Sequence, residues 1–284
     1  MTVLDRVAMK AATAYARLTM ASPIYRDGDS QFEMTVAAVS DLGGGMRRIT
    51  FSAEAFGDFR LVGCDEYFGL LMPRPGAALT LPDGSRENVR AAIADMPEAD
   101  RPDLRWYTVR AHHAVNRTID VDIVTHCESG ADSGPGSAWA CAAQVGDRVG
   151  FRSGGALFRG HECDGSMLLV ADETALPALA AIVDAHPTVL DRATIHVEVA
   201  DTAILAAYAF GGAEVTVHVR TDGVPGSVVL PALRDANLGK LDYAWICGES
   251  GMVTEGRRHL VKGVGVDRRQ VLFSGYWKLG QERG

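Results

Sequence analysis

Three side chains in the stretch Arg105-Trp106-Tyr107-Thr108 could together bind a planar, phosphorylated ligand. Alternate side chains of a strand share a face, so we expect Arg105 and Tyr107 on one side and Thr108 on the other. A guanidinium group pairs with a diphosphate, a tyrosine ring stacks on a conjugated ring, and a threonine hydroxyl bonds to a ring nitrogen. Aromatic residues on strands also fill hydrophobic cores, so the stretch by itself leaves both interpretations open.

A second group of candidate residues lies in residues 122–126, DIVTH, and 134–139, GPGSAW. Gly134 and Gly136 allow a ligand to approach the backbone closely, and we expect Ser137 to cap a helix over residues 136–145. The open amides of a helix N-terminus attract phosphate. The alternative is a plain Gly-Pro-Gly loop with Trp139 in the core.

The elements that must position these residues are short β-type runs between Gly, Pro and Asp breaks. We expect strands at residues 32–42, 47–53, 68–72, 104–112, 118–125 and 147–152. Apolar and acidic residues alternate over 119–123, IDVDI, which predicts a strand with two unlike faces. Several short strands with regular turn signals indicate an antiparallel β-barrel or sandwich.

The pattern changes after residue 166, where apolar runs alternate with helical segments. We expect strands at 167–172, 194–200, 215–220, 243–249 and 270–277, and helical stretches at 175–186, 202–209 and 250–264. Such alternation predicts βαβ units and a parallel sheet. The chain is therefore divided into an N-terminal helical extension (1–30, with a helix over 3–20), a β domain (31–160) and an α/β domain (161–284).

Composition and charge exclude several classes of protein. The chain has 284 residues, of which 47% are hydrophobic, and 28 basic against 36 acidic residues leave a net charge of −8. We find no basic stripe for nucleic acid and no apolar run long enough for a membrane span, and charged residues interrupt any signal peptide. The five scattered cysteines form no CxxC pair, which predicts reduced thiols, no metal site and a cytoplasmic protein.

Six motifs, taken in order, resemble the siderophore-interacting protein family. They are RWYT (105–108), DIVTH (122–126), GPGSAW (134–139), ADETALPA (171–178), AWICGES (244–250) and SGYWKLG (274–280). The resemblance extends over roughly residues 31–280, and DETALPA and GYWKxG are its most specific parts. Members of this family are flavoproteins of the ferredoxin-reductase-like group that reduce ferric siderophores.

The resemblance implies a Greek-key barrel that holds FAD, followed by a parallel α/β domain for NADH or NADPH. Thr108 and His126 would be the catalytic residues, with Thr108 near flavin N5. The other residues implied to contact the flavin from the barrel are Arg105, Tyr107, Asp122, Val124, Gly134, Pro135, Gly136, Ser137 and Trp139.

In the α/β domain the resemblance implies that Asp172, Thr174 and Ala175 contact the cofactor. Gly248 and Glu249, at the end of a later strand, would receive the nicotinamide, and Trp277 belongs to the same cofactor-binding set. The alternative for Gly248 and Glu249 is an ordinary strand-to-helix turn with a helix-starting Glu.

The chain departs from the family in the implied substrate pocket and on the flavin loop. Many members have basic residues at three pocket positions, which here are Gly69, Ala138 and Lys278, so only Lys278 is cationic. A ferric tris-catecholate is a trianion and a ferric tris-hydroxamate is nearly neutral, so we expect a preference for hydroxamate-type siderophores. On the flavin loop, Cys127 replaces a glycine and Gly136 replaces an alanine.

The electron donor and the acceptor stay open at this point. NADH, NADPH or a ferredoxin-like protein could supply the electrons, and Arg220 and Arg257-Arg258 are candidate partners of a 2′-phosphate. Alternatives to a ferric-siderophore reductase are a flavin reductase that acts on other acceptors and a flavin- or siderophore-binding protein without useful turnover.

Overall fold

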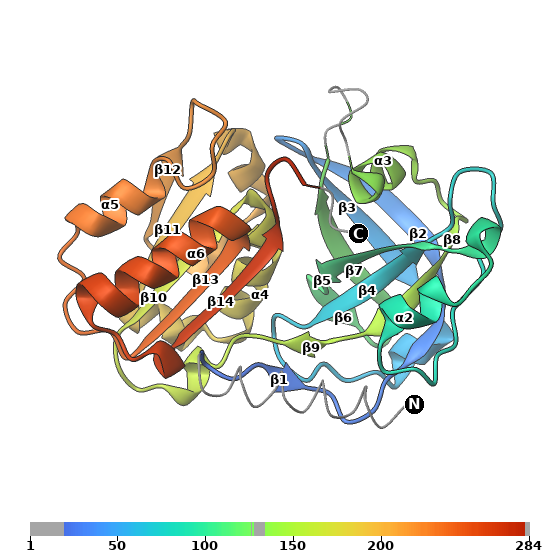
Figure 1. The fold of residues 1–284 in the computed structure, drawn as a ribbon, viewed down its shortest axis with the longest axis horizontal. Helices are drawn as coiled ribbons and strands as arrows, with labels where there is room; N and C mark the ends of the chain where they lie inside the picture. The colour runs from blue at the N-terminus through green and yellow to red at the C-terminus, as the bar shows by residue number, and fades with distance from the viewer. Residues whose placement is uncertain (1–19, 126, 128–133, 282–284) are drawn as a thin grey trace. The chain divides into compact units, whose positions relative to one another are not determined.

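The computed structural model describes residues 20–125, 127 and 134–281. Within them the chain divides into two compact units, residues 24–156 and residues 20–23 with 157–281 (Figure 1). The helix expected over residues 3–20 lies outside the described residues except at its last position. None of the helices in this described part has the length and hydropathy that a membrane span needs.

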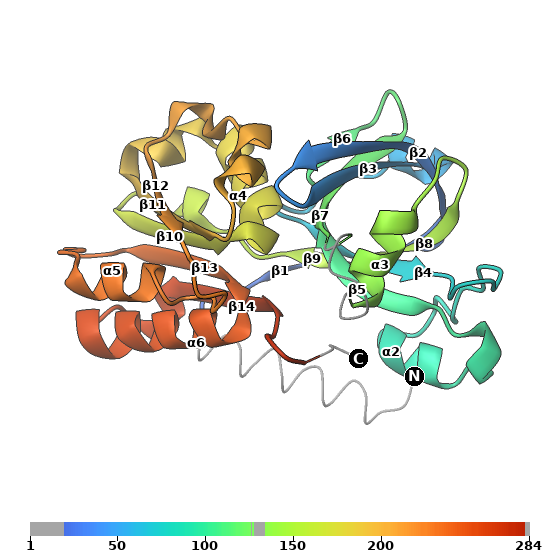
Figure 2. The same cartoon turned by 90° about the horizontal axis from the view of Figure 1, so that it is seen from above.

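An antiparallel sheet of seven strands forms the first unit. The strands are β2 (Gln31–Gly43), β3 (Met46–Ser52), β4 (Tyr67–Met72), β5 (Asp103–Thr108), β6 (Ala111–His113), β7 (Thr118–Val124) and β8 (Arg148–Ser153). They lie in the order β5-β4-β8-β2-β3-β7-β6, so the last strand in sequence is inserted between β4 and β2, as in a Greek key. Figure 2 shows this sheet curling into a barrel. A small separate sheet pairs β1 (Ile24–Tyr25) with β9 (Gly155–Ala156).

Alternate side chains of these strands fill the interior of the barrel. On β7, Ile119, Val121 and Ile123 belong to the apolar core, and the acidic residues between them point to the other face. The two-faced strand expected from the sequence is therefore confirmed. The ring of Phe151 stacks against Phe68, with 4.9 Å between ring centroids.

Three details of this unit differ from the sequence-based expectations. The expected strand over 104–112 is two strands, because Val109 bonds to the Glu66 carbonyl and Arg110 to the Asp120 carbonyl. A short helix α2 (Val89–Ala94), capped by the side chain of Asn88, had no counterpart in the expectations. Helix α3 (Pro135–Ala142) begins after Gly134, so the expectation that Ser137 caps it is wrong. Proline is favoured at the first helical position because it has no amide to leave unpaired.

The second unit is built on five parallel strands. They are β10 (Met167–Asp172), β11 (Ala193–Val199), β12 (Val215–Val219), β13 (Tyr243–Glu249) and β14 (Val271–Trp277). Their order is β12-β11-β10-β13-β14, and it reverses direction between β10 and β13. Sheets of this kind bind ligands beyond the carboxyl ends of the strands at such a switch point. The expected fold, an antiparallel β-barrel followed by a parallel α/β sheet, is confirmed.

Helices cover both faces of this sheet (Figure 2). Helix α4 (Leu176–Ala185) lies on one face, and α5 (Val229–Asp235) and α6 (Ser250–Arg258) lie on the other. Strands β10 and β13 are buried along their whole length, which explains why they read as continuous apolar runs. The expected helix over 202–209 is a 3₁₀-helix (Thr202–Ala207), and the one over 250–264 ends in a π-helix (His259–Val264).

Candidate functional site

The end of strand β5 and the start of helix α3 lie in close contact. Gly136 packs against both Arg105 and Tyr107 of β5. A Cβ atom at position 136 would come within 3.0 Å of the Tyr107 hydroxyl, a distance that real Cβ atoms essentially never show. With the Tyr107 side chain in this position, only glycine lets the helix approach the strand this closely.

The first turn of α3 offers groups that bind anions. Its N-cap is Gly134, which has no side chain to bond to the first amides of the helix. At the other end, Arg47 Nη1 donates to the carbonyls of Ala140 and Cys141, each at 2.7 Å. Beside the first turn stands Arg105, whose Cγ would lie 3.2 Å from a Cβ at position 136. The Arg105 side chain thus lies beside the N-terminus of α3, and its Nη1 donates to the Leu104 carbonyl at 2.7 Å. The diphosphate of FAD fits the remaining guanidinium donors together with the first amides of the helix.

Tyr107 and Thr108 point to opposite faces of β5, as expected. The Tyr107 ring packs against the barrel core, and burial raises the pKa of its hydroxyl to about 12, although Arg105 opposes the shift. The phenol is therefore neutral at physiological pH. Thr108 is 6% exposed and lies opposite Tyr67 of β4.

Asp122 is held by an ion pair that the sequence analysis did not anticipate. Arg48 donates from Nε to Oδ1 at 2.7 Å and from Nη2 to Oδ2 at 2.8 Å. The two residues are direct partners across β3 and β7, and an alignment of these strands would have revealed the pair. Val124 ends β7 opposite Met46 and is half-buried. His126 lies outside the described residues.

The remaining candidate residues of the barrel lie in α3. Pro135 occupies the first position, and Ser137 lies half-buried in the first turn. Trp139 packs against the barrel core and stacks on Phe51, with 6.1 Å between ring centroids. This is the core position that the sequence also allowed for Trp139.

A disulfide joins Cys127, just after β7, to Cys141 in the last turn of α3, with 5.7 Å between the Cα atoms. The prediction of reduced thiols is wrong for this pair. The two cysteines are 14 residues apart, without a recognisable spacing, and only the fold of the loop and helix brings them together. Cys64, Cys163 and Cys247 are reduced thiols.

In the α/β unit, the carboxylate of Asp172 joins residues that are far apart in sequence. Its Oδ1 accepts hydrogen bonds from the amide of Thr174 at 2.9 Å and from the hydroxyl of Thr174 at 2.6 Å. Its Oδ2 accepts from the amide of Glu249 at 2.7 Å and from Nε1 of Trp277 at 2.8 Å. Four residues singled out from the sequence therefore meet at the ends of β10, β13 and β14.

The neighbours of Asp172 explain its environment. Gly248 has a φ of +143°, and a Cβ there would lie 2.5 Å from Asp172 Cγ, so glycine is required. Burial, followed by the charge of Glu173, raises the pKa of Asp172 from 3.8 to about 6, against the hydrogen bonds from Thr174 and Trp277. Ala175, which is fully buried, ends the 3₁₀ turn (Glu173–Ala175) ahead of α4.

Glu249 caps the N-terminus of α6. Its Oε2 accepts from the amides of Gly251 at 2.5 Å and Met252 at 2.9 Å, and its Oε1 accepts from the amide of Leu279 at 3.1 Å. Glu249 therefore forms the strand-to-helix turn that the sequence allowed, and it also holds the segment after β14. Lys278, in that segment, is exposed.

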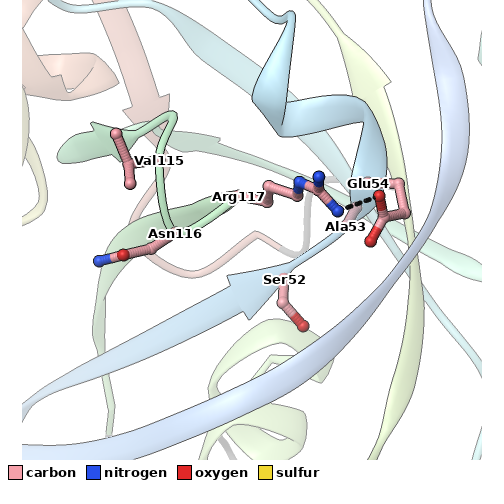
Figure 3. A pocket seen from close by; sticks show the side chains of 6 residues that line it. All are labelled: Ser52, Ala53, Glu54, Val115, Asn116 and Arg117. Carbon is pink, nitrogen blue, oxygen red and sulfur yellow. Dashed lines mark hydrogen bonds and ion pairs between the residues drawn. The ribbon is translucent and has the colours of Figure 1, made fainter.

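A shallow pocket in the barrel unit lies away from these residues. Figure 3 shows its lining at the turn between β6 and β7 and at the start of the 3₁₀ turn Glu54–Gly57, with an exposed ion pair between Arg117 and Glu54. None of the residues singled out from the sequence lines it. The candidate residues therefore form two groups, one in the barrel unit and one in the α/β unit.

Known proteins resemble the chain in both units. Residues 35–156 match the siderophore-interacting FAD-binding domain, and residues 165–280 match the siderophore-interacting protein domain. An uncharacterised protein of Mycobacterium tuberculosis is 34% identical over 203 residues, which cover 67% of this chain and 70% of that protein. The NADPH-dependent ferric-chelate reductase of Escherichia coli is 30% identical over 147 residues, 52% of this chain and 54% of that protein.

A solved structure is similar over nearly the whole chain. The siderophore utilization protein from T. fusca superimposes with a TM-score of 0.74 and 28% identity, covering 91% of this chain and 97% of that one.

Proposed function

Because the chain belongs to the siderophore-interacting protein family, we propose that it is an FAD-dependent ferric-siderophore reductase that takes electrons from NADH or NADPH. When bound, FAD accepts two electrons as a hydride and passes them on singly, which suits ferric iron. One hydride thus reduces two ferric siderophores, and iron leaves as Fe(II), which hard oxygen ligands bind less tightly. The proposed location is the cytoplasm, where NADH and NADPH are available, and the Cys127–Cys141 disulfide is an exception to the reduced thiols usual there.

One observation carries this proposal: Arg105, Tyr107 and the start of α3 meet within the segment that matches the FAD-binding domain. The Arg105 guanidinium and the α3 amides neutralise the FAD diphosphate. Tyr107, a neutral phenol, would contact the isoalloxazine, and Thr108 would form a hydrogen bond near its N5. Val124, which ends β7, would line the flavin, as the family resemblance implies.

The switch point of the α/β sheet is the proposed place for the nicotinamide nucleotide. Asp172, Gly248 and Glu249 lie there at the carboxyl ends of β10 and β13. The Trp277 indole is fixed by its hydrogen bond to Asp172, so its ring can orient a nicotinamide.

The substrate proposed for this reductase is a hydroxamate-type ferric siderophore. At position 69 a Cβ would lie 2.8 Å from Leu104 Cδ1 and 3.5 Å from the Trp106 ring, so a long cationic side chain there would have to displace Leu104. Ala138 is exposed and uncharged. With only Lys278 supplying positive charge, a nearly neutral iron complex is favoured over a trianion.

The test is an anaerobic titration of purified, FAD-loaded protein. NADH or NADPH is expected to bleach the flavin absorbance, and a ferric hydroxamate is then expected to restore it while a ferrous-specific dye records Fe(II). A protein that binds no FAD in a calorimeter would refute the proposal. A flavin that is reduced by the nucleotide but not reoxidised by ferric siderophores would point to a different acceptor.

A further inference from the structure

Buried carboxylates bond to backbone amides at three places along the carboxyl edge of the parallel sheet: the 3₁₀ turn ahead of α4, the N-terminus of α5 and the N-terminus of α6. Asp172 accepts from the Thr174 amide ahead of α4, and Glu249 accepts from two amides of α6. Glu198 of β11 is fully buried, and its two oxygens accept from the amides of Gly226, Val228 and Val229 ahead of α5, at 2.6, 3.0 and 2.8 Å.

These carboxylates change which ligands the carboxyl edge of the parallel sheet can bind. A helix N-terminus attracts phosphate through its open amides and its positive dipole end. Here a negative side chain already bonds to amides at the N-termini of α5 and α6 and offsets their dipoles. At α4 the carboxylate of Asp172 bonds to the preceding 3₁₀ turn, and the N-cap Ala175 contributes no side-chain hydrogen bond. The N-termini of α5 and α6 therefore differ from that of α3 in the barrel, whose N-cap Gly134 contributes no side-chain hydrogen bond.

Arg220 is the one arginine or lysine in the described segments that follow β10, β11, β12 and β13, which are residues 173–186, 200–214, 220–228 and 250–256. It is 7% exposed and donates from both Nη atoms to the carboxylate of Glu173, from Nη1 at 2.8 Å. The same Nη1 lies 3.9 Å from Glu198 Oε1. Its charge is therefore neutralised twice and turned away from solvent.

The other candidate cations lie elsewhere. Arg257 and Arg258 are in the last turn of α6, which starts at the carboxyl edge and runs away from it. The Arg257 guanidinium lies 4.6 Å from the centroid of the Phe273 ring, and Arg258 pairs with Glu255. Neither is placed for a ligand at the carboxyl edge.

The second residue after β11 is acidic. Asp201 is exposed two residues after β11, the strand next to β10, and its Oδ1 accepts from the amide of Ala203 at 2.8 Å. A carboxylate at this place in nucleotide-binding sheets bonds to the ribose 2′-hydroxyl. A 2′-phosphate in place of that hydroxyl adds a charge of about −1.5 to −2. It would face Asp201 while Arg220 stays paired with Glu173.

We infer that this edge selects NADH over NADPH, and that Glu173 determines the choice by sequestering Arg220. The inference rests on the proposed function and narrows its electron donor. The inferred preference for NADH distinguishes this chain from the E. coli relative, which is named an NADPH-dependent reductase.

The experiment measures kcat/KM for NADH and for NADPH in flavin reduction by the FAD-loaded protein. NADH is expected to be better by about tenfold or more, the factor that one charge-assisted hydrogen bond is worth. Two variants test the cause. Glu173→Gln removes the closer of the two carboxylates that neutralise Arg220, and Ala200→Arg adds a cation at an exposed position after β11. Both variants should lower the ratio of kcat/KM for NADH to kcat/KM for NADPH. The control is Ala236→Arg, at an exposed position after α5, which should leave this ratio unchanged.

A second readout avoids turnover. Flavin difference spectra during titration with NAD⁺ and NADP⁺ should give weaker binding of NADP⁺, and Ala200→Arg should reduce that difference. Equal use of the two donors, or a preference for NADPH, overturns the inference and leaves the reductase intact. If neither nucleotide reduces the flavin, but chemically reduced flavin still reduces the ferric siderophore, the nucleotide donor itself is wrong and the inference falls with it.

Discussion

The contact between Gly136 and Tyr107 predicts a substitution whose effect depends on a single oxygen atom. Gly136→Ala places a Cβ too close to the Tyr107 hydroxyl, and crowding of this kind costs about 1–3 kcal/mol. Alanine in a helix offsets this by up to about 1 kcal/mol relative to glycine. The variant should therefore be less stable than the native chain and should bind FAD more weakly, because α3 must move away from Arg105.

Tyr107→Phe removes the oxygen that causes the crowding. The closest remaining atoms to the new Cβ are then Arg105 Cγ at 3.2 Å and the Cζ of residue 107 at 3.4 Å, and the flexible arginine can give way. In this background Gly136→Ala should be neutral or stabilising by up to about 1 kcal/mol. The coupling between the two substitutions should be about 1–3 kcal/mol.

Urea unfolding of the four proteins, without FAD, measures this coupling. Gly134→Ala is the matched control, since a Cβ there has no atom within 4 Å. Gly134→Ala should lower the free energy of unfolding by about 0.5–1 kcal/mol, the usual N-cap preference for glycine over alanine. The loss should be the same with Tyr or Phe at position 107. If Gly136→Ala has the same effect whether residue 107 is Tyr or Phe, the packing argument for Gly136 is refuted.

Three further predictions concern other parts of the chain. Reduction of the Cys127–Cys141 disulfide should lower the free energy of unfolding by about 3 kcal/mol for a loop of this length, measured with and without reductant, and a Ser-Ser double variant should be insensitive to reductant. Burial, then His218, lowers the pKa of His196 to about 4, below its usual 6.5, so the unfolded chain takes up the proton first. The contribution of His196 to the free energy of unfolding should be complete above about pH 6.5. Between pH 6.5 and pH 4 it should fall by at most about 1.4 kcal/mol per pH unit. His196→Leu should flatten that slope, and an unchanged slope would contradict the assignment. Ala138→Arg should lower KM for a ferric catecholate by up to about tenfold at low salt, with little change for a hydroxamate; a catecholate KM that does not move argues against the charge-based preference.

Much of the site was predictable because its motifs follow chain order. Arg105 and Tyr107 share a face by strand geometry alone, and the alternation over β7 already separates a core face from a polar face. The end of β10 and the end of β13 could be placed at one edge, because parallel strands finish on the same side of a sheet. The outcome for Glu249, a helix cap, was one of the two alternatives that the sequence left open.

Other features depend on distances between segments that local patterns do not encode. The Arg48–Asp122 pair needs the register of β3 against β7, and the Cys127–Cys141 bond needs the path from β7 through α3. Neither register nor loop path follows from hydrophobic periodicity, because both depend on how whole elements pack.

The amino-acid sequence by itself determined the two-unit architecture, the family resemblance and most candidate positions, since periodicity and motif order are local properties of the chain. Only the tertiary structure decided which charges remain available to a ligand. The sequence predicted Arg220 as a cation at the end of a strand, but in the fold Arg220 is paired with Glu173. Arg105, in contrast, lies beside the first turn of α3. A charge acts through its neighbours and its burial, and both are set by contacts between residues distant in sequence.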